Sequence, residues 1–251
     1  MAIRVAVLSD IHGNLAALEA ALADIKRHKP DRIAIAGDLL LSGPRPAEVA
    51  DRVRALEADG ALVIQGNTDI AVADFDYGAA FPGLEEVPAG HIAAAEWAHD
   101  QLSDEHLDWL RRLPSERRLT VDSELFLLCH ASPGSNTAGL ATDLDPTVTV
   151  ERVTRTDART IACGHTHVAD VRELGQRLIV NPGSCGYAFD GDPAACWALV
   201  TLPDDENEPD PTAELFRPPY DAAVAAEEVA ARGLHGDVYR AATIRTGRLI
   251  R

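Results

Sequence analysis

The sequence predicts an α/β fold, and two features of its 251 residues carry that prediction. Short, nearly continuous apolar runs recur along the chain, as in strands that are buried on both faces. Longer segments with leucine, isoleucine or valine at helical spacing lie between several of these runs, so strands and helices alternate. A third feature, the polar residues directly after each apolar run, places a functional site at one edge of the predicted sheet.

Six apolar runs are predicted to be the central strands. In order, they are Ile3–Leu8, Arg32–Ala36, Ala61–Ile64, Leu125–Leu128, Thr160–Ala162 and Arg177–Val180. Helices are expected over Leu15–Arg27 and Pro46–Ala58, where apolar residues recur every three or four positions. Two further strands, Cys196–Leu202 and Ala213–Arg217, are expected near the end of the chain.

The alternation of strands and helices breaks between residues 70 and 113. We expect these residues to form a small helical insert, or cap, that makes one wall of the site. Pro88–Leu102 and Asp104–Leu113 have helical patterns, and Ser103 is the expected N-cap of the second helix. No linker rich in proline, glycine or serine divides the chain, so residues 1–251 are expected to form one domain.

The C-terminal residues 203–251 are expected to contribute a hairpin strand, a helix and a tail. The helix is predicted over Asp221–Arg232 and ends at Gly233, a residue suited to the left-handed conformation of a C-cap. The acidic residues 203–211 are expected to form a solvated loop between the last two strands.

Charge and cysteine content narrow the classes of function. The chain has 23 Lys and Arg residues against 40 Asp and Glu residues, a formal net charge of −17. This balance argues against a broad nucleic-acid surface or an anionic membrane surface, because phosphate groups require clusters of Lys and Arg. No apolar stretch matches a membrane-spanning helix, and the N-terminus lacks a signal-peptide pattern.

The four cysteines include no CxxC pair and are expected to be free buried thiols of a cytoplasmic protein. Nothing in the sequence encodes an oligomeric state, although a homo-oligomer is a common assembly.

Polar residues follow the six apolar runs at the point where each predicted strand ends. They are Ser9-Asp10-Ile11-His12-Gly13-Asn14, Gly37-Asp38, Gly66-Asn67-Thr68-Asp69, His130-Ala131-Ser132, Gly164-His165-Thr166-His167 and Asn181-Pro182-Gly183-Ser184. Ligands of open α/β sheets bind outside the carboxyl ends of the strands. Five of these strand ends therefore carry metal-binding side chains to one edge of the sheet.

The donor types and their spacing indicate a metal centre. Asp10 and His12 are two residues apart, so both side chains are expected on one side of an extended segment, and His165 and His167 repeat that spacing. Oxygen and imidazole donors without a thiolate suit Mn, Fe, Zn, Ni or Mg. Seven donors exceed the four of a tetrahedral ion, and two ions that share a carboxylate fit the number better. One such histidine is usually structural, but the ordered set is not expected by chance.

These motifs resemble the signature of the calcineurin-like metallophosphoesterase superfamily, which is D-x-H, G-D, G-N-[HD], a later His and G-H-x-H. The resemblance spans residues 1 to about 200, and Asn181-Pro-Gly-Ser184 is similar to a segment of small bacterial members. It implies a four-layer αββα sandwich. It also implies two divalent metal ions as cofactors, with manganese expected first and Fe, Zn, Ni or Mg as the other choices.

The resemblance further implies a role for each motif residue. The first metal is expected on Asp10, His12 and His167, the second on Asn67, His130 and His165, with Asp38 bridging both. A hydroxide between the ions would be the nucleophile, and Asp38, Asn67 and His130 are the residues assigned to catalysis. Two ions contribute +4, and Asp10, Asp38 and hydroxide contribute −3, so the site is near +1 and attracts phosphate.

Thr68 is the main departure from the family pattern. Many members carry His directly after G-N, where it assists the leaving group, and threonine is a poor acid at neutral pH. Thr68, Asn14 and Arg45 are candidates for substrate binding. Arg45 would replace an arginine that the protein Ser/Thr phosphatase subgroup uses to hold phosphate. Asp69 is given only a weak supporting role.

The sequence therefore predicts a phosphoesterase that hydrolyses small phosphomonoesters or phosphodiesters at a dinuclear metal site. The alternative is a catalytically weak or inactive binding scaffold on the same fold, which Thr68 favours and the complete ligand set opposes. A mononuclear hydrolase of a non-phosphate ester or amide is a third interpretation, and the seven donors argue against it. The chain lacks a G-x-S-x-G elbow, a G-x-G-x-x-G motif and a P-loop, so serine-hydrolase, NAD and ATP chemistry have no support.

Overall fold

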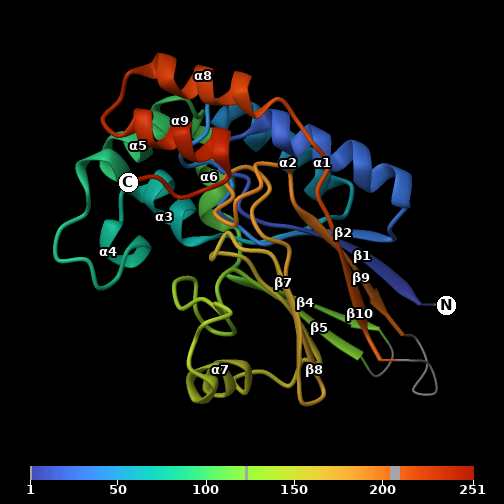
Figure 1. Ribbon diagram of the computed structural model, residues 1–251. Coiled ribbons are helices and arrows are strands. Elements are labelled where there is room, and N and C mark those ends of the chain that lie inside the picture. The colour runs from blue at the N-terminus through green and yellow to red at the C-terminus, as the bar shows by residue number, and fades with distance from the viewer. Residues whose placement is uncertain (1, 122–123, 204–209) are drawn as a thin grey trace.

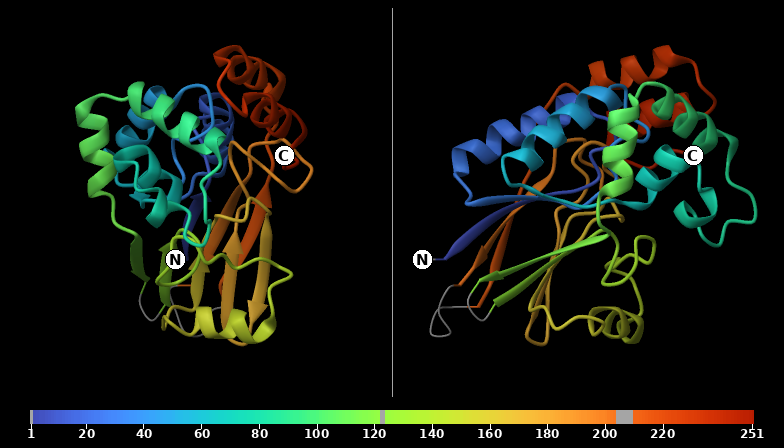
Figure 2. Two further views of the ribbon diagram at one scale, coloured as in Figure 1. Left: turned by 90° about the vertical axis from the view of Figure 1, so that its left-hand side faces the viewer. Right: turned by 180° about the vertical axis from the view of Figure 1, so that it is seen from behind.

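The computed structural model of the chain describes residues 2–121, 124–203 and 210–251. Two five-stranded sheets lie face to face at the centre, and helices cover their outer faces (Figures 1 and 2). The predicted α/β fold of αββα type is confirmed. Within these described ranges, no helix is both long and apolar enough to cross a bilayer.

Sheet A is built around β1, which runs parallel to β2 and antiparallel to β9. In spatial order the sheet comprises β10 (Thr212–Phe216), β9 (Trp197–Leu202), β1 (Ile3–Leu8), β2 (Arg32–Ile35) and β3 (Leu62–Val63). β3 pairs in parallel with β2. Since β1, β2 and β3 are parallel, their carboxyl ends open onto the same edge of the sheet.

Sheet B has a parallel centre and antiparallel edges. In spatial order it comprises β4 (Glu116–Val121), β5 (Glu124–Cys129), β6 (Thr160–Ala162), β8 (Arg177–Asn181) and β7 (Asp170–Leu174). β5, β6 and β8 are parallel to one another, while β4 and β7 pair in the antiparallel sense. The carboxyl ends of the three central strands therefore also meet at one edge.

Side-chain alternation along the strands builds the layers. In β1, Val5 and Val7 enter the core between the two sheets, whereas Leu8 packs against the helices over sheet A. In β5, Phe126 faces the inter-sheet core and Leu127 faces the helix under sheet B. Because successive strand side chains point to opposite faces, each of these runs must be apolar at every position.

Nine helices occur in the described part of the chain. They are α1 (Leu15–His28), α2 (Pro46–Ala58), α3 (Asn67–Asp74), α4 (Tyr77–Ala80), α5 (Ala89–Asp100), α6 (Asp104–Arg112), α7 (Pro146–Val153), α8 (Ala222–Arg232) and α9 (Asp237–Thr246). α1 and α2 pack on sheet A, and α7 packs on the outer face of sheet B. The predicted caps are present, since Ser103 accepts a hydrogen bond from the His106 backbone N–H and Gly233 has a φ of 71°.

Some elements were not predicted from the sequence. β4 and β7 are edge strands with half-exposed, charged faces, so they lack the continuous apolar run of a central strand. α9 replaces most of the expected C-terminal tail. Its N-cap is Gly236, which provides no capping side chain, and the helix is held by packing against α8. Residues 204–209 of the expected acidic loop lie outside the described residues.

Three glycines allow the loops at the carboxyl ends of the strands to pack against one another. A β-carbon on Gly37 would lie 2.4 Å from the Gly66 nitrogen, and one on Gly66 would lie 2.2 Å from Asp38 Oδ1. A β-carbon on Gly164 would lie 1.8 Å from Ser9 Oγ and 2.5 Å from Asp10 Oδ2. These contacts leave no room for a side chain, as expected from their positions after the strands.

We expect Gly164→Ala to lower the free energy of unfolding by about 1–3 kcal/mol, because the added methyl group overpacks a buried contact. Urea denaturation of the purified variant measures this change. Gly78→Ala, within α4, is the matched control. A β-carbon on Gly78 would meet only Asp76 Oδ1, at an ordinary contact distance of 3.5 Å. Wild-type stability in Gly164→Ala would mean that the loops around Ser9 and Asp10 can move apart.

Candidate metal centre

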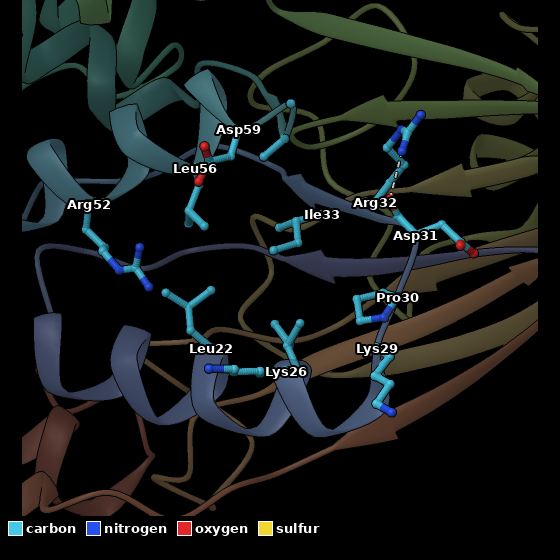
Figure 3. Close-up of a pocket in the computed structure, with 13 residues that line it drawn as sticks. Leu22, Lys26, Lys29, Pro30, Asp31, Arg32, Ile33, Arg52, Leu56 and Asp59 are labelled. Carbon is cyan, nitrogen blue, oxygen red and sulfur yellow. Dashed lines mark hydrogen bonds between the residues drawn. The ribbon is translucent and has the colours of Figure 1, made fainter.

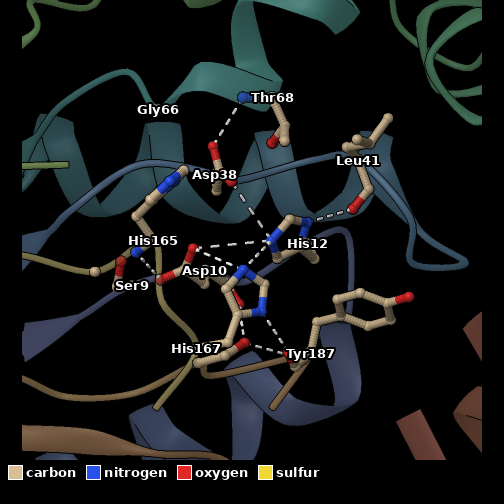
Figure 4. A network of polar contacts seen from close by, with 12 residues as sticks. Ser9, Asp10, His12, Asp38, Leu41, Gly66, Thr68, His165, His167 and Tyr187 are labelled. Carbon is tan, nitrogen blue, oxygen red and sulfur yellow. Dashed lines mark hydrogen bonds and ion pairs between the residues drawn. The ribbon is translucent and has the colours of Figure 1, made fainter. Parts of the chain in front are cut away.

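The structure brings all seven predicted ligands together at the carboxyl ends of the strands. Figure 4 shows five of them, Asp10, His12, Asp38, His165 and His167. The seven come from the loops after β1, β2, β5 and β6 and from the start of α3, and they are Asp10, His12, Asp38, Asn67, His130, His165 and His167. All are buried except His165, which is partly exposed. Residues separated by more than 150 positions thus form one cluster.

Asp10, His12 and His167 form the first half-site. The Nε2 atoms of the two histidines are 3.2 Å apart, and His167 Nε2 lies 3.2 Å from Asp10 Oδ1. With Asp38, these residues offer four ligand atoms that all lie within 4.8 Å of one another. The ligand atoms of a single ion have separations of this size.

Backbone carbonyls fix which nitrogen of each imidazole faces the first half-site. His12 Nδ1 donates to the Leu41 carbonyl oxygen at 2.8 Å, and His167 Nδ1 donates to that of Tyr187. In the neutral rings, both Nε2 atoms therefore present lone pairs to each other. Asp10 Oδ1 is buried and lacks a hydrogen-bond partner within the described residues. Facing acceptor atoms repel one another, and a bound cation removes that repulsion, so these residues fit a metal ion.

Asn67, His130 and His165 form the second half-site. Asn67 Oδ1 lies 3.0 Å from both His130 Nε2 and His165 Nδ1, and those nitrogens are 3.3 Å apart. His130 Nδ1 donates to the Ala36 carbonyl oxygen at 2.6 Å. The Asn67 amide donates to the Ala80 carbonyl oxygen at 2.9 Å, which turns its oxygen toward the histidines. The second half-site therefore also presents acceptor atoms that converge.

Asp38 lies between the two half-sites. Its Oδ2 is 3.6 Å from His12 Nε2 in the first half-site, and its Oδ1 is 3.4 Å from His130 Nε2 in the second. The backbone N–H of Thr68, in the first turn of α3, donates to Asp38 Oδ1 at 2.9 Å. The helix N-terminus thus stabilises the negative charge of this carboxylate.

The backbone reaches this arrangement in a way that differs from the prediction. Asp10 and His12 have φ angles of 54° and 52°, and His165 and His167 have 69° and 58°. These residues are in left-handed loops after the strands, so the alternation of an extended segment does not align them. His165 and His167 accordingly serve different half-sites. Left-handed backbone is uncommon for residues with a β-carbon, and such residues cluster at functional sites.

Burial and neighbouring charges shift the pKa values of the cluster. Burial, and then the nearby His167, lowers the pKa of His12 to about 4. Burial, and then His130, lowers the pKa of His165 to about 4. Both imidazoles are therefore neutral at pH 7, which is the form that binds a metal. Burial alone would raise the pKa of Asp10, but the adjacent histidines, His167 foremost, hold it below its ordinary value.

Asp69 has a larger structural role than the sequence indicated. It is fully buried, and its carboxylate accepts hydrogen bonds from the Leu39 N–H at 2.8 Å and the Gly66 N–H at 2.9 Å. Leu39 follows Asp38, and Gly66 precedes Asn67, so one side chain joins the two loops that carry these residues. Burial, and then the charge of Asp38, raises the pKa of Asp69 to about 7. No spacing rule marks such a residue in the sequence.

The structure places the three candidates for substrate binding in different environments. Asn14 is fully buried; its amide nitrogen donates to the Gly186 carbonyl and the Tyr220 hydroxyl, and its oxygen caps α1. Its amide donors are therefore used by the fold, in contrast to the prediction.

The other two candidates differ from Asn14 and from each other. Arg45 is exposed and its Nε pairs with Glu228 on α8 at 3.2 Å. Thr68 Oγ1 is buried and has no hydrogen-bond partner among the described residues.

A cavity of about 700 Å³ lies elsewhere on the molecule, at the C-terminal ends of α1 and α2 (Figure 3). Its floor includes Leu22, Ile33 and Leu56, and basic residues such as Lys26 and Arg52 stand at its rim. No histidine lines it. Lys26 is in the last turn of α1, where it offsets the helix dipole, and Arg52 pairs with Glu19 at 2.7 Å, so both have a structural explanation.

We expect Asp69→Asn to weaken metal binding by about 10- to 100-fold, the usual cost of losing a residue that supports ligands. The amide would place a donor opposite one of the two backbone N–H groups. Calorimetric titration of metal-depleted protein with Mn²⁺ measures the change. Asp74→Asn, on the exposed face of α3, is the control. Unchanged affinity in Asp69→Asn would show that the two loops hold their positions without this bridge.

Comparison with known proteins is consistent with this geometry. A model of the calcineurin-like phosphoesterase superfamily domain matches residues 3–205. A metallophosphoesterase structure from Sphaerobacter thermophilus is 27% identical, covers 98% of this chain and 100% of its own, and has a TM-score of 0.74. Hypothetical protein PH1004 from Pyrococcus horikoshii shares the fold, with 21% identity, a TM-score of 0.81 and 98% of both chains covered.

A relative in sequence comes from Methanocaldococcus jannaschii. This protein, MJ0912, is 26% identical over 240 residues, which cover 90% of this chain and 91% of its own. The family model spans the strands and loops that supply the seven clustered residues. The chain belongs to the calcineurin-like phosphoesterase superfamily.

Proposed function

We propose that this protein is a dinuclear metal-dependent phosphoesterase that hydrolyses small phosphomonoesters or phosphodiesters. One observation carries the proposal: two groups of converging acceptor atoms share the carboxylate of Asp38. Asp10, His12 and His167 would hold one ion, and Asn67, His130 and His165 the other. The oxygen and imidazole donors suit Mn²⁺ and also Fe, Zn, Ni or Mg.

The residues of the chain divide the work at this site. Two divalent ions, when bound, would supply Lewis acidity and an ionised water at neutral pH. The backbone carbonyls of Leu41, Ala36 and Tyr187 hold the Nδ1 atoms of the imidazoles, so that their Nε2 atoms would be free to bind the ions. The hydroxyl of Thr68, which has no hydrogen-bond partner among the described residues, would donate to an anionic substrate. In a chain of −17, this centre is where a phosphate is attracted.

Thr68 also limits the leaving groups that the site can handle. Threonine does not donate a proton readily at neutral pH, so a leaving group has to depart without an acid at this position. Substrates with acidic leaving groups are therefore favoured. The alternative function, a binding scaffold with little activity, rests on this same residue, while the complete ligand set supports catalysis.

We expect His130→Ala and Asp38→Ala to reduce hydrolysis of bis-p-nitrophenyl phosphate and p-nitrophenyl phosphate by more than about 100-fold. Each substitution removes a ligand, which should cost more than the 10- to 100-fold typical of residues behind ligands. The assay contains Mn²⁺ and is repeated with a chelator, which should abolish wild-type turnover. His235→Ala, an exposed histidine outside the cluster, is the control.

Full activity in either ligand variant would exclude this centre as the catalytic site. Metal content near two ions per chain, without turnover of any ester tested, would favour the scaffold. Protein that takes up no metal would overturn both interpretations of the cluster.

We expect Thr68→Val to lower kcat/KM for the same esters by about 10- to 100-fold, because it removes a hydrogen bond to a charged group worth about 1.5–3 kcal/mol. Valine keeps the shape of the side chain, so metal content should not change. Thr68→Ser keeps the hydroxyl and should retain most of the activity. Equal kcat/KM values for Thr68→Val and wild type would show that the hydroxyl does not contact the substrate.

A further inference from the structure

The C-terminal helices α8 and α9 lie beyond residues 3–205, the part of the chain that the family model matches. They pack on each other through Ala226, Val229 and Ile244. Figures 1 and 2 show them side by side next to α5 at one end of the molecule. Two chains of contacts run from this helical pair to the first half-site.

The first chain of contacts begins at Arg232, the last residue of α8. Its guanidinium is largely buried and donates to the carbonyl oxygens of Ser42 at 2.9 Å and Gly43 at 2.8 Å. It also pairs with Asp237 at 2.7 Å and lies 4.4 Å above the ring of Trp97. A planar guanidinium can bind two neighbouring carbonyls at once, which a lysine cannot reproduce.

The carbonyls that Arg232 binds belong to the loop that orients His12. Leu41, one residue before Ser42, supplies the carbonyl that accepts the His12 Nδ1–H. Ser42 has a φ of 87°, a left-handed value that needs support from its surroundings. A β-carbon on Gly43 would lie 2.0 Å from the His12 carbonyl oxygen, so the loop is packed directly against His12.

The second chain of contacts runs through Tyr187 to His167. The Tyr187 carbonyl accepts the His167 Nδ1–H. The centroid of the Tyr187 ring lies 5.4 Å from that of the His12 ring and 5.9 Å from that of the His167 ring. The Tyr187 side chain packs against the apolar cluster that α8 and α9 form around Ala226, Val229 and Ile244. Figure 4 shows Tyr187 beside both histidines, with its hydroxyl directed away from them.

The second half-site is oriented by other parts of the chain. The Ala36 carbonyl orients His130, and the Ala80 carbonyl in α4 orients Asn67. Neither carbonyl accepts a hydrogen bond from α8 or α9 in the described residues. The two half-sites therefore have separate supports.

We infer that α8 and α9 position the first half-site, with Arg232 as the main positioning residue and the packing of Tyr187 on the two helices as the second contact. The inference rests on the proposed two-metal centre. It adds that the affinity for one ion depends on the C-terminal helices, whereas the affinity for the other does not. Loss of Arg232 should loosen the loop at Ser42 and Gly43, and with it the imidazole of His12. The ion on Asn67, His130 and His165 should be unaffected.

Calorimetric titration of metal-depleted full-length protein with Mn²⁺ tests this inference. Wild type should bind two ions. Arg232→Met should weaken one of them by about 10-fold or more and leave the other within about twofold, and Arg232→Lys should restore part of the loss. The site that remains should match the single site of a His12→Ala variant. Glu228→Gln, which removes another contact between α8 and the loop at Arg45, is the control.

The outcomes separate the inference from the function on which it rests. Fewer than two ions in wild type would overturn the dinuclear centre. If wild type binds two ions, and Arg232→Met either leaves both affinities unchanged or lowers both by the same factor, the inference alone is overturned. Asp237 keeps Arg240 as a partner at 2.8 Å when Arg232 is replaced. If Arg232→Met nevertheless fails to fold, Ile244→Ala, which removes part of the cluster behind Tyr187, must weaken the same ion. An unchanged titration in that variant would reject the inference.

Discussion

The convergence of buried acceptor atoms at the edge of the two sheets is the constraint on which the rest of this structure depends. Carboxylate oxygens and imidazole nitrogens of Asp10, His12 and His167 face one another at 3.2–3.8 Å. Such a cluster is costly in a protein interior unless a cation binds to it. The strands, loops and helix ends around it are arranged so that the acceptor atoms cannot turn away.

The loops hold this cluster through backbone conformation and close packing. Asp10, His12, Asp38, His165 and His167 all adopt left-handed φ angles. Each such residue costs free energy, which a close-packed surrounding must offset. Gly37, Gly66 and Gly164 permit that packing because a side chain at any of them would strike a neighbouring loop. The rigidity of the centre thus comes from contacts among loops, which the sheets bring to one edge.

A second layer of groups orients these side chains, and it comes from segments that are far apart in the sequence. Backbone carbonyls fix three imidazoles, the carboxylate of Asp69 joins the loops of Asp38 and Asn67, and the helical segment α4 fixes the amide of Asn67. Helices outside the family-matched region add the buried pair of Arg232 and Asp237. Variation in these outer elements can change the site while the ligands themselves stay the same.

The sequence by itself determined the central strands, the helices α1, α2 and α8, and the identity of the seven clustered residues. It could do so because buried strands are continuously apolar and because the ligand side chains directly follow them. It did not reveal the polar edge strands β4 and β7 or the helix α9, whose stability comes from their neighbours. Only the tertiary structure decided how these residues reach the half-sites that the resemblance implied, since left-handed loops, and not an extended segment, orient His165 and His167. It also decided the roles of Asn14, Asp69 and Arg232, because backbone carbonyls and N–H groups occur at nearly every residue and only folding selects the ones that these side chains meet.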